Sequence, residues 1–403
     1  MKLAIVGGGP AGLYLSVLLK RRDPSHEIVV YERNAEGSTY GWGVTYWAGL
    51  LDKLRAGDPE SARAVADASV TWTDGVAIVR DERTVHHGDA GFGIGRRRML
   101  ALLADRARAL GVRIELEHAV TGPDAPELAG ADLVVAADGV NSALREAYAD
   151  HFGSRVTNGR NPYVWLGTTK VFDSFSFAFK ETAHGWIWCY AYGFSGERST
   201  CVVECSPETR TGLGLDALGE ADSLRLLEKI FHDLLDGHGL IGRDRADDPA
   251  RWLTFRTLTN RVWHRDNLVL LGDAAHTTHY SIGAGTTLAL EDALALADAL
   301  APSAPRDLDT ALTLYGKRRR AELLSAQSAA RYSARWYEDL PRYMCLEPAR
   351  MFALLGQRHS PLLPHVPPQL YYRLDRAADR LESLRRLKRW LGPRVARAVH
   401  GRR

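Results

Sequence analysis

The sequence predicts an α/β fold that opens with a Rossmann-like nucleotide-binding unit. Three observations predict it. A glycine-rich turn follows a short apolar strand near the N-terminus, an acidic residue ends the next strand, and a second apolar strand at 268–271 runs into Gly-Asp. A length of 403 residues leaves room for this unit, a second domain and a terminal extension.

The glycine-rich turn has the G-x-G-x-x-G pattern, between the apolar strand 3–6 and a segment 13–20 with helical spacing. Glycine permits the tight turn and the close approach of a pyrophosphate to the helix N-terminus. A second strand, 28–31, ends at Glu32, which is placed to bind ribose hydroxyls. The cofactor contacts expected in this unit are Gly7, Gly9, Pro10, Ala11, Gly12, Glu32 and Arg33.

The segment 268–287 indicates which dinucleotide is bound. The apolar run Leu268 to Leu271 predicts a buried strand, and Asp273 at its carboxyl end can accept a hydrogen bond from a ribityl hydroxyl of FAD. Gly283 and Gly285 let the backbone approach an isoalloxazine ring. The helix that begins there, with Thr286, directs N–H groups toward the polar edge of that ring.

This pattern resembles the second FAD-binding motif of group A flavin monooxygenases, the p-hydroxybenzoate-hydroxylase-like family. Asp138 and Gly139, after the apolar strand 132–137, are similar to the Asp-Gly motif of that family, which touches FAD and the transient nicotinamide cofactor. Arg96 matches the family arginine on the flavin side. The resemblance implies a glutathione-reductase-type FAD-binding domain with an inserted β-sheet substrate domain and C-terminal helices.

On this resemblance, the FAD-binding domain is expected to be discontinuous, over residues 1–69, 90–150 and 258–330. Residues 70–89 and 151–257 fit the substrate-binding β-sheet domain, because β-branched and aromatic runs alternate with turns there. A C-terminal helical extension is expected over 331–403. Its leucines between 370 and 391, together with Ala377, recur every three or four residues with arginines between them, so we expect this helix to pack on the body of the protein.

Further segments are similar to one subgroup of the family, which contains salicylyl-CoA 5-hydroxylases, anthraniloyl-CoA monooxygenases and the violacein-pathway hydroxylase of protodeoxyviolaceinate. These segments are 41–44, 58–61, 159–161, 165–170, 203–206 and 279–283. The CoA-ester enzymes often have lysine where this chain has Thr287, and the segment Pro364 to Pro368 resembles the end of the violacein enzyme. Both features favour an aromatic amino-acid-derived or indole-type substrate over a CoA thioester.

The resemblance also implies the chemistry. NADH or NADPH is the expected transient reductant and O2 the co-substrate, and oxygen passes through a C4a-hydroperoxyflavin to an electron-rich aromatic ring. The first alternative function is hydroxylation of an aromatic acyl-CoA of the salicylyl-CoA or anthraniloyl-CoA type. A flavin-dependent halogenase and a non-catalytic flavoprotein that protects an unstable intermediate are less favoured alternatives.

His279 and Tyr280, in the flavin-side loop, are the candidate catalytic residues, and Trp165, Trp188 and Tyr190 are candidates for the substrate pocket. For His279 the alternative is a loop histidine bonded to the backbone, and for Trp188 and Tyr190 it is core packing.

Composition limits the partners. The formal net charge of +3 provides no global field for nucleic acid, and no apolar stretch reaches membrane-spanning length. We expect no signal peptide, because the first strand begins directly at Leu3, and the four cysteines lack the spacing of a redox pair. His86 and His87 lack a third ligand at zinc-like spacing, so no metal is expected. We expect a cytoplasmic monomer or homodimer that acts on a small aromatic molecule.

Overall fold

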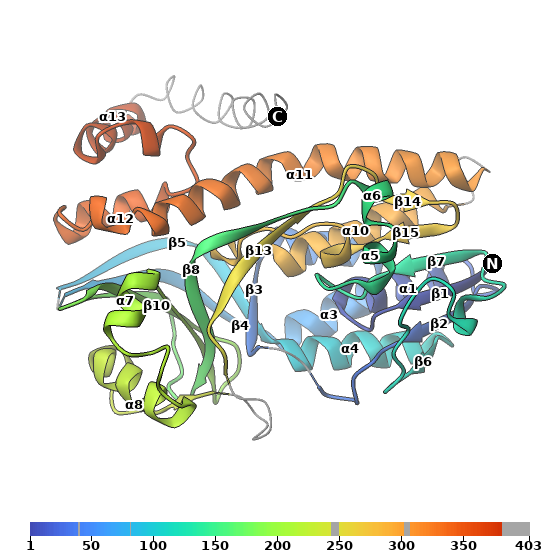
Figure 1. Ribbon diagram of the computed structural model, residues 1–403, viewed down its shortest axis with the longest axis horizontal. Helices are drawn as coiled ribbons and strands as arrows, with labels where there is room; N and C mark the ends of the chain where they lie inside the picture. Colours follow the sequence, from blue (N-terminus) through green and yellow to red (C-terminus); the bar gives the residue numbers. More distant parts are fainter. Residues whose placement is uncertain (39–40, 81, 243–249, 302–306, 381–403) are drawn as a thin grey trace.

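The computed structural model describes residues 1–38, 41–80, 82–242, 250–301 and 307–380, and it contains two β-sheets joined by a long helix (Figure 1). The first sheet has six strands in the order β14-β15-β7-β1-β2-β6. In that order the strands are His264–Arg265, Leu268–Leu270, Leu133–Ala136, Lys2–Val6, Glu27–Tyr31 and Arg113–Glu115. All neighbours pair in parallel except β14 with β15, which confirms the predicted Rossmann-like unit.

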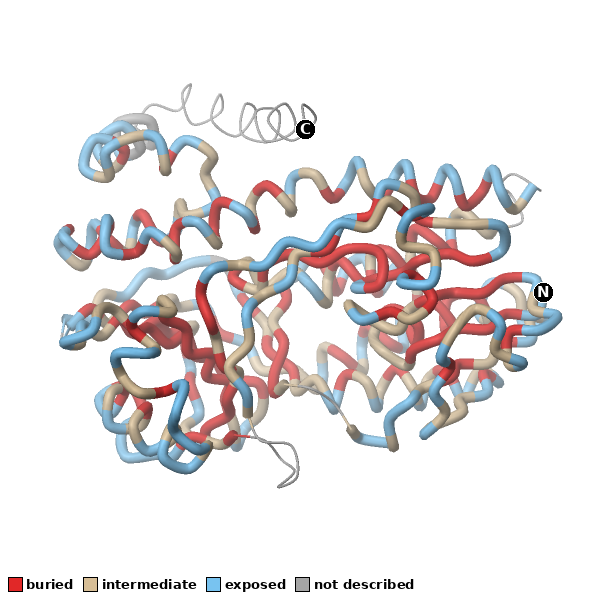
Figure 2. Tube along the Cα trace, in the orientation of Figure 1, coloured by how far each residue is buried: buried red, intermediate tan, exposed pale blue. Residues whose placement is uncertain are grey.

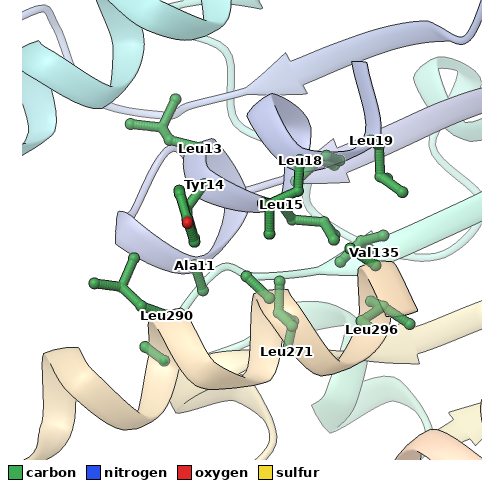
Figure 3. Packing of buried hydrophobic residues seen from close by; sticks show 14 of the residues in the cluster. Ala11, Leu13, Tyr14, Leu15, Leu18, Leu19, Val135, Leu271, Leu290 and Leu296 are labelled. Atoms are coloured by element: carbon green, nitrogen blue, oxygen red, sulfur yellow. The ribbon is translucent and has the colours of Figure 1, made fainter. Parts of the chain in front are cut away.

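Helices α1 (Pro10–Arg22) and α10 (Gly285–Ala299) pack against each other beside this sheet. Residues 11–19 of α1 are all buried, since the helix contacts α10 on one side and α4 (Arg96–Ala109) on the other. Figure 3 shows side chains of α1 and α10 meeting next to Val135 of β7 and Leu271. This packing holds the N-termini of α1 and α10 in fixed positions.

The second sheet has nine strands, eight of them in the order β12-β8-β11-β10-β9-β4-β5-β3, with β13 paired to β8. These strands are Leu240–Ile241, Arg155–Thr168, Ser199–Cys205, Gly185–Gly193, Phe175–Thr182, Val70–Val79, Glu82–Gly95, Gly43–Trp47 and, for β13, Leu253–Thr259. The β-branched and aromatic runs between 155 and 205 therefore form strands as predicted. The runs at 70–73 and 77–79 belong to one strand with an irregularity between Trp72 and Asp74.

Each face of the second sheet is covered by different helices. Val164 and Leu166 on one face pack with Leu227 of α8 (Glu220–Ile230). The other face is rich in aromatic residues, and it packs against the end of α11 (Leu308–Glu338) and against α12 (Pro348–Gly356). The remaining helices are α2 (Ala48–Gly57), α3 (Pro59–Asp67), α5 (Ala143–Ala147), α6 (Ala149–Phe152), α7 (Pro207–Gly212) and α9 (His232–Leu235).

Helix α11 (Leu308–Glu338) runs across both halves of the molecule (Figure 1). Leu312 and Tyr315 belong to the core of the first sheet, whereas Trp336 and Tyr337 belong to the aromatic cluster on the second. Buried and exposed positions alternate along the whole helix (Figure 2). The division expected at 330/331 falls inside this continuous helix, and the division expected at 89/90 falls inside β5.

The last described helix, α13 (Pro368–Arg380), attaches by an aromatic residue rather than by its leucines. Tyr371 is buried and donates a hydrogen bond to Ser360 Oγ at 2.9 Å, whereas Leu370 and Leu374 are 48% and 56% exposed. The expectation that the leucine stripe packs on the protein is therefore wrong at these two positions. The rest of that stripe, Leu381 to Leu391, lies outside the described residues. Among the described helices, none is long and apolar enough to cross a membrane.

Two glycines of the N-terminal turn are required by the backbone itself. Gly7 has a φ of +112°, and a Cβ there would lie 2.2 Å from the carbonyl oxygen of Ala137. A Cβ on Gly12 would lie 2.2 Å from the carbonyl oxygen of Gly7. Gly9 differs, since a Cβ there meets nothing within 4 Å. Gly7 and Gly12 allow the strand and the helix to pack closely, whereas Gly9 leaves open space in front of α1.

We therefore expect Gly7→Ala to lower the free energy of unfolding of the apoprotein by at least about 2 kcal/mol, through backbone strain and the clash with Ala137. Gly9→Ala is the matched control and should change this free energy by less than about 0.5 kcal/mol. Urea unfolding of both FAD-free variants, followed by circular dichroism, measures the difference. Equal losses in the two variants would contradict this assignment.

Candidate active site

Four neighbouring parallel strands end at residues with cofactor chemistry. In spatial order β15, β7, β1 and β2 are followed by Asp273, Asp138, the turn 7–12 and Glu32. Parallel strands lie about 4.8 Å apart, so these positions span roughly 14 Å along one edge of the sheet. Ligands of open α/β sheets bind outside the carboxyl ends of the strands. The edge thus offers a continuous binding line for an extended dinucleotide.

The end of this line at β2 carries the residues predicted to bind ribose and pyrophosphate. Glu32 Oε2 accepts a hydrogen bond from the Gly8 N–H at 2.8 Å, and Oε1 accepts one from the Asn34 N–H at 2.9 Å. A carboxylate has about four acceptor positions, so hydroxyl groups of a ribose can still bind. Helix α1 has no side-chain cap and no acidic residue in its first turn, which leaves its N–H groups free for an anion. Arg33 is exposed beside it.

Asp138 lies at the centre of the line. Its Oδ2 accepts a hydrogen bond from the Ala143 N–H at 2.9 Å, whereas Oδ1 is buried and has no partner among the described residues. Burial raises the pKa of this carboxyl group. A Cβ on Gly139, whose φ is +85°, would meet nothing within 4 Å. An unpaired buried acceptor next to open space fits a ligand that donates hydrogen bonds.

Asp273, in the short helix η2 (Gly272–Ala274), also has free acceptor positions. Its carboxylate accepts no hydrogen bond from the described residues, although solvent can reach it. Desolvation raises its pKa, while His276 and Arg96 act in the opposite direction. Arg96, the first residue of α4, is thus within electrostatic reach of Asp273. The geometry suits a ribityl hydroxyl as donor and places a cation close to it.

A buried ionic network, which the sequence analysis missed, fixes the segment that carries Asp273. Asp292 of α10 is fully buried and accepts hydrogen bonds from His276 Nε2 at 2.8 Å and from Arg319 Nε of α11 at 2.7 Å. The Gly272 N–H donates to the same carboxylate at 3.2 Å. Together these partners hold the pKa of Asp292 below its usual range despite complete burial.

The loop before α10 carries the residues that the sequence analysis expected on the flavin side. Helix η3 (Tyr280–Ile282) ends at Gly283, whose φ is +61° and whose Cβ would lie 2.8 Å from Thr45 Oγ1. A Cβ on Gly285 would meet nothing within 4 Å. Helix α10 begins there, with Thr286 in its first turn, no side-chain cap and no acidic residue. The two uncapped helix N-termini, Oδ1 of Asp138 and the carboxylate of Asp273 fit the phosphates, hydroxyls and ring edge of FAD.

His279 is engaged by its own loop, as the alternative interpretation expected. Its Nδ1 lies 2.8 Å from Ser281 Oγ, and the side chain caps η3 by accepting from the Ser281 N–H. Burial lowers the pKa of His279 to about 3, so the imidazole is neutral at physiological pH. The ring packs against Phe255 at 5.0 Å between centroids. His279 therefore offers the pocket a neutral polar edge rather than a cation.

Tyr280 makes a contact that the sequence analysis missed. Its hydroxyl donates to Glu204 Oε2 of β11 at 2.6 Å, and Asn161 Nδ2 donates to Glu204 Oε1 at 2.9 Å. Glu204 is 1% exposed, and burial raises its pKa to about 7. One signal was present in the sequence: a glutamate stands within a strand, 199–205, of which every residue is buried.

The three aromatic pocket candidates lie on one face of the second sheet. Trp188 is 2% exposed and stacks on Tyr337 of α11 at 5.7 Å, which is the core packing considered as its alternative. Tyr190 stacks with Tyr280 at 6.1 Å. Trp165 lies against Gly41, where a Cβ would be 2.5 Å from the indole ring. Tyr190 and Trp165 thus face the flavin-side loop and the glycine segment.

Removing the buried carboxylate should destabilise the whole site. In Asp292→Ala the charged Arg319 stays buried without its main partner, and we expect a loss of about 3–5 kcal/mol in the free energy of unfolding. Asp298→Ala, on the same helix, removes a half-exposed carboxylate paired with Arg22 and should cost at most about 1 kcal/mol. Chemical denaturation of both variants tests this, and similar losses would show that the Asp292 network does not hold the fold.

Curated relatives cover most of the chain. A salicyloyl-CoA 5-hydroxylase from Streptomyces is 39% identical over 352 residues, which are 85% of this chain but 66% of that protein. A 3-hydroxy-4-methyl-anthranilyl-[aryl-carrier protein] 5-monooxygenase from Streptosporangium sibiricum is 36% identical, over 85% of this chain and 90% of the relative. Protodeoxyviolaceinate monooxygenase from Chromobacterium violaceum is 31% identical, over 94% and 100%. These relatives confirm the predicted similarity to the subgroup of salicylyl-CoA, anthraniloyl-CoA and protodeoxyviolaceinate hydroxylases.

The fold is also found in solved structures. The tetrameric form of 2-methyl-3-hydroxypyridine-5-carboxylic acid oxygenase matches with a TM-score of 0.67 and 19% identity, over 84% of this chain and 91% of that one. The family described as FAD binding domain matches residues 1–326. The chain therefore belongs to this FAD-binding family of flavoprotein monooxygenases.

Proposed function

We propose that this protein is an FAD-dependent hydroxylase of an electron-rich aromatic ring, which consumes NADH or NADPH and O2. One observation carries the proposal: the cofactor residues of four strands form one line, and that line ends at a loop whose Tyr280 contacts the aromatic face of the second sheet. The relatives named above are a hydroxylase and two monooxygenases, which favours hydroxylation over halogenation and over a non-catalytic role.

Each position along this edge of the first sheet would bind a different part of FAD. Glu32 would hold the adenosine ribose, the N-terminus of α1 the pyrophosphate, Asp273 the ribityl chain and the N-terminus of α10 the polar ring edge. When bound and reduced, FAD together with O2 supplies an electrophilic oxygen atom. The chain's own task is to hold the substrate ring in place and to exclude water, for which the aromatic face and the neutral His279 are suited.

For the substrate we propose an aromatic amino-acid-derived or indole-type compound. Two features support it: Thr287 in the first turn of α10, where the CoA-ester enzymes often have lysine, and the segment Pro364 to Pro368. A thioester is the second candidate. It is favoured by relatives of 39% and 36% identity whose names specify a CoA ester and a carrier-bound anthranilyl group.

The cofactor assignment predicts that Glu32→Ala and Asp273→Ala each weaken FAD binding. Losing an acceptor for a buried hydroxyl should cost roughly 1–3 kcal/mol, about one to two orders of magnitude in affinity. Titration of the apoprotein with FAD, followed by quenching of flavin fluorescence, measures it. Asp266→Ala, which removes an exposed carboxylate elsewhere, is the control and should bind normally. Normal affinity in both test variants would remove the assigned cofactor site.

The substrate proposal predicts coupled hydroxylation of free aromatic compounds. Aromatic amino acids, kynurenines and indoles should be compared with salicylyl-CoA and anthraniloyl-CoA by quantifying hydroxylated product per NAD(P)H consumed. Product must be measured, because a poorly placed ring can stimulate NAD(P)H oxidation that ends in hydrogen peroxide. Near-stoichiometric product from the thioesters, with peroxide alone from the others, would reject our choice and support the second candidate.

A further inference from the structure

A carboxylate stands in the middle of the aromatic face of the second sheet. Cross-strand pairing places Tyr163 of β8, Glu204 of β11 and Trp188 of β10 in one row on this face. In the next row Trp165, Val202 and Tyr190 are neighbours. Packing alone does not explain an acidic residue here, because the positions around Glu204 are large and aromatic or apolar.

Glu204 has no cationic partner within the described part of the chain. This distinguishes it from the buried Asp292, which is paired with Arg319. A buried carboxylate without a cation is expensive to ionise, and such groups are retained chiefly at functional sites. Two hydrogen bonds, from Tyr280 and Asn161, compensate Glu204 in part.

Polar atoms around Glu204 remain unpaired. The hydroxyl of Tyr190 and Oδ1 of Asn161 are buried and have no hydrogen-bond partner among the described residues. The Trp188 indole also faces the carboxylate and helps to lower its pKa, although its geometry falls short of a hydrogen bond. Unpaired buried groups of this kind point to a ligand that completes the network.

Tyr280 connects this network to the flavin-side loop. It lies three residues before Gly283, and its ring contacts Tyr163 at 4.4 Å and His279 at 4.3 Å between centroids. Tyr280 is partly exposed, whereas Glu204 is buried behind it. A substrate beside the flavin-side loop would therefore meet Tyr280 before Glu204, and the carboxylate would act through the tyrosine.

We propose that Tyr280 and Glu204 form a proton relay that recognises an aromatic substrate by a hydroxyl, amino or indole N–H donor on its ring. This deepens the proposed hydroxylase function and rests on it. A phenolic donor gives its proton to the Tyr280 oxygen, while the Tyr280 proton passes to Glu204 Oε2. An amino or indole N–H donates a hydrogen bond to the Tyr280 oxygen and releases its proton along the same path only as positive charge develops on the attacked ring. The electron pair left on the donor atom moves into the ring and makes it a better nucleophile. Glu204 ends as a neutral carboxylic acid, and no redox change occurs in the relay.

The ionisation of Glu204 sets when the relay can accept a proton. Burial raises its pKa to about 7, while hydrogen bonds from Tyr280 and Asn161 oppose the rise. The carboxylate is thus available above about pH 7 and is lost as the pH falls through that value. The titratable groups on the same face around Glu204 are Tyr163, Tyr190, Tyr280, Tyr337 and Glu338, and Cys205 follows in the same strand on the opposite face.

Ligand binding to the oxidised holoenzyme, without NAD(P)H, tests the relay apart from turnover. The probes are phenol with anisole, and indole with 1-methylindole, titrated by the change in flavin absorbance. One pH unit above the Glu204 pKa of about 7, the donor-bearing probe of each pair should bind about tenfold more tightly, and one unit below it the preference should fall to about threefold or less.

Three variants complete the experiment. Glu204→Gln should show the same preference at both pH values, because glutamine does not titrate, and Tyr280→Phe should lose the preference altogether. Glu208→Gln, an exposed glutamate four residues along, should behave like the wild type. If Glu204→Gln fails to fold, Tyr280→Phe decides. The coupled hydroxylation rate should also rise through about pH 7 in the wild type and lose that limb in Glu204→Gln.

Equal affinity within each probe pair in the wild type, or binding of neither probe up to its solubility, would overturn the relay. So would a Glu204→Gln protein that keeps the wild-type pH dependence. The two proposals fail separately. A pH-dependent preference without hydroxylation of any tested compound would reject the hydroxylase function alone, whereas hydroxylation with a pH-independent preference would reject the relay alone.

Discussion

The hydrogen bonds to the Asp292 carboxylate are the constraint on which the cofactor edge depends. This buried carboxylate accepts hydrogen bonds from the Gly272 N–H, the His276 ring and the Arg319 guanidinium. It therefore joins η2, α10 and α11 at one point. Asp273 follows Gly272 directly, and the N-terminus of α10 lies two turns before Asp292. The position of Asp273 and that of the α10 N-terminus are thus set by the same ionic contact.

Much of the first sheet could be predicted because its signals are local. A short apolar strand, a glycine turn and a terminal acidic residue lie within the first 32 positions, and Asp138 and Asp273 each follow their own apolar strand. Since parallel strands share an edge, neighbouring strands bring these residues together. In the second sheet β4, β8, β9, β10 and β11 were predicted, at least in part, from aromatic and β-branched runs between turns, whereas β3, β5, β12 and β13 were not predicted.

The remainder depends on contacts between distant segments, which periodicity does not encode. Arg319 meets Asp292 across two helices, and Glu204 meets Tyr280 across 76 positions. A glutamate in a strand reads as an exposed residue until the sheet is known to be covered on both faces. The prediction that the leucines of the last helix pack on the protein is wrong at Leu370 and Leu374. An amphipathic pattern shows which face of a helix is apolar, but it does not show that another surface is available to cover that face.

The continuity of α11 imposes a constraint of rotational phase. The helix buries Tyr315 and Arg319 against the first half of the molecule and Trp336 and Tyr337 against the second, with no break between them. Each residue of a helix advances the side-chain direction by about 100°. Inserting or deleting one residue between positions 320 and 335 would turn Trp336 and Tyr337 away from the second sheet. The number of residues between Arg319 and Trp336 is therefore as strictly fixed as the identity of the buried residues themselves.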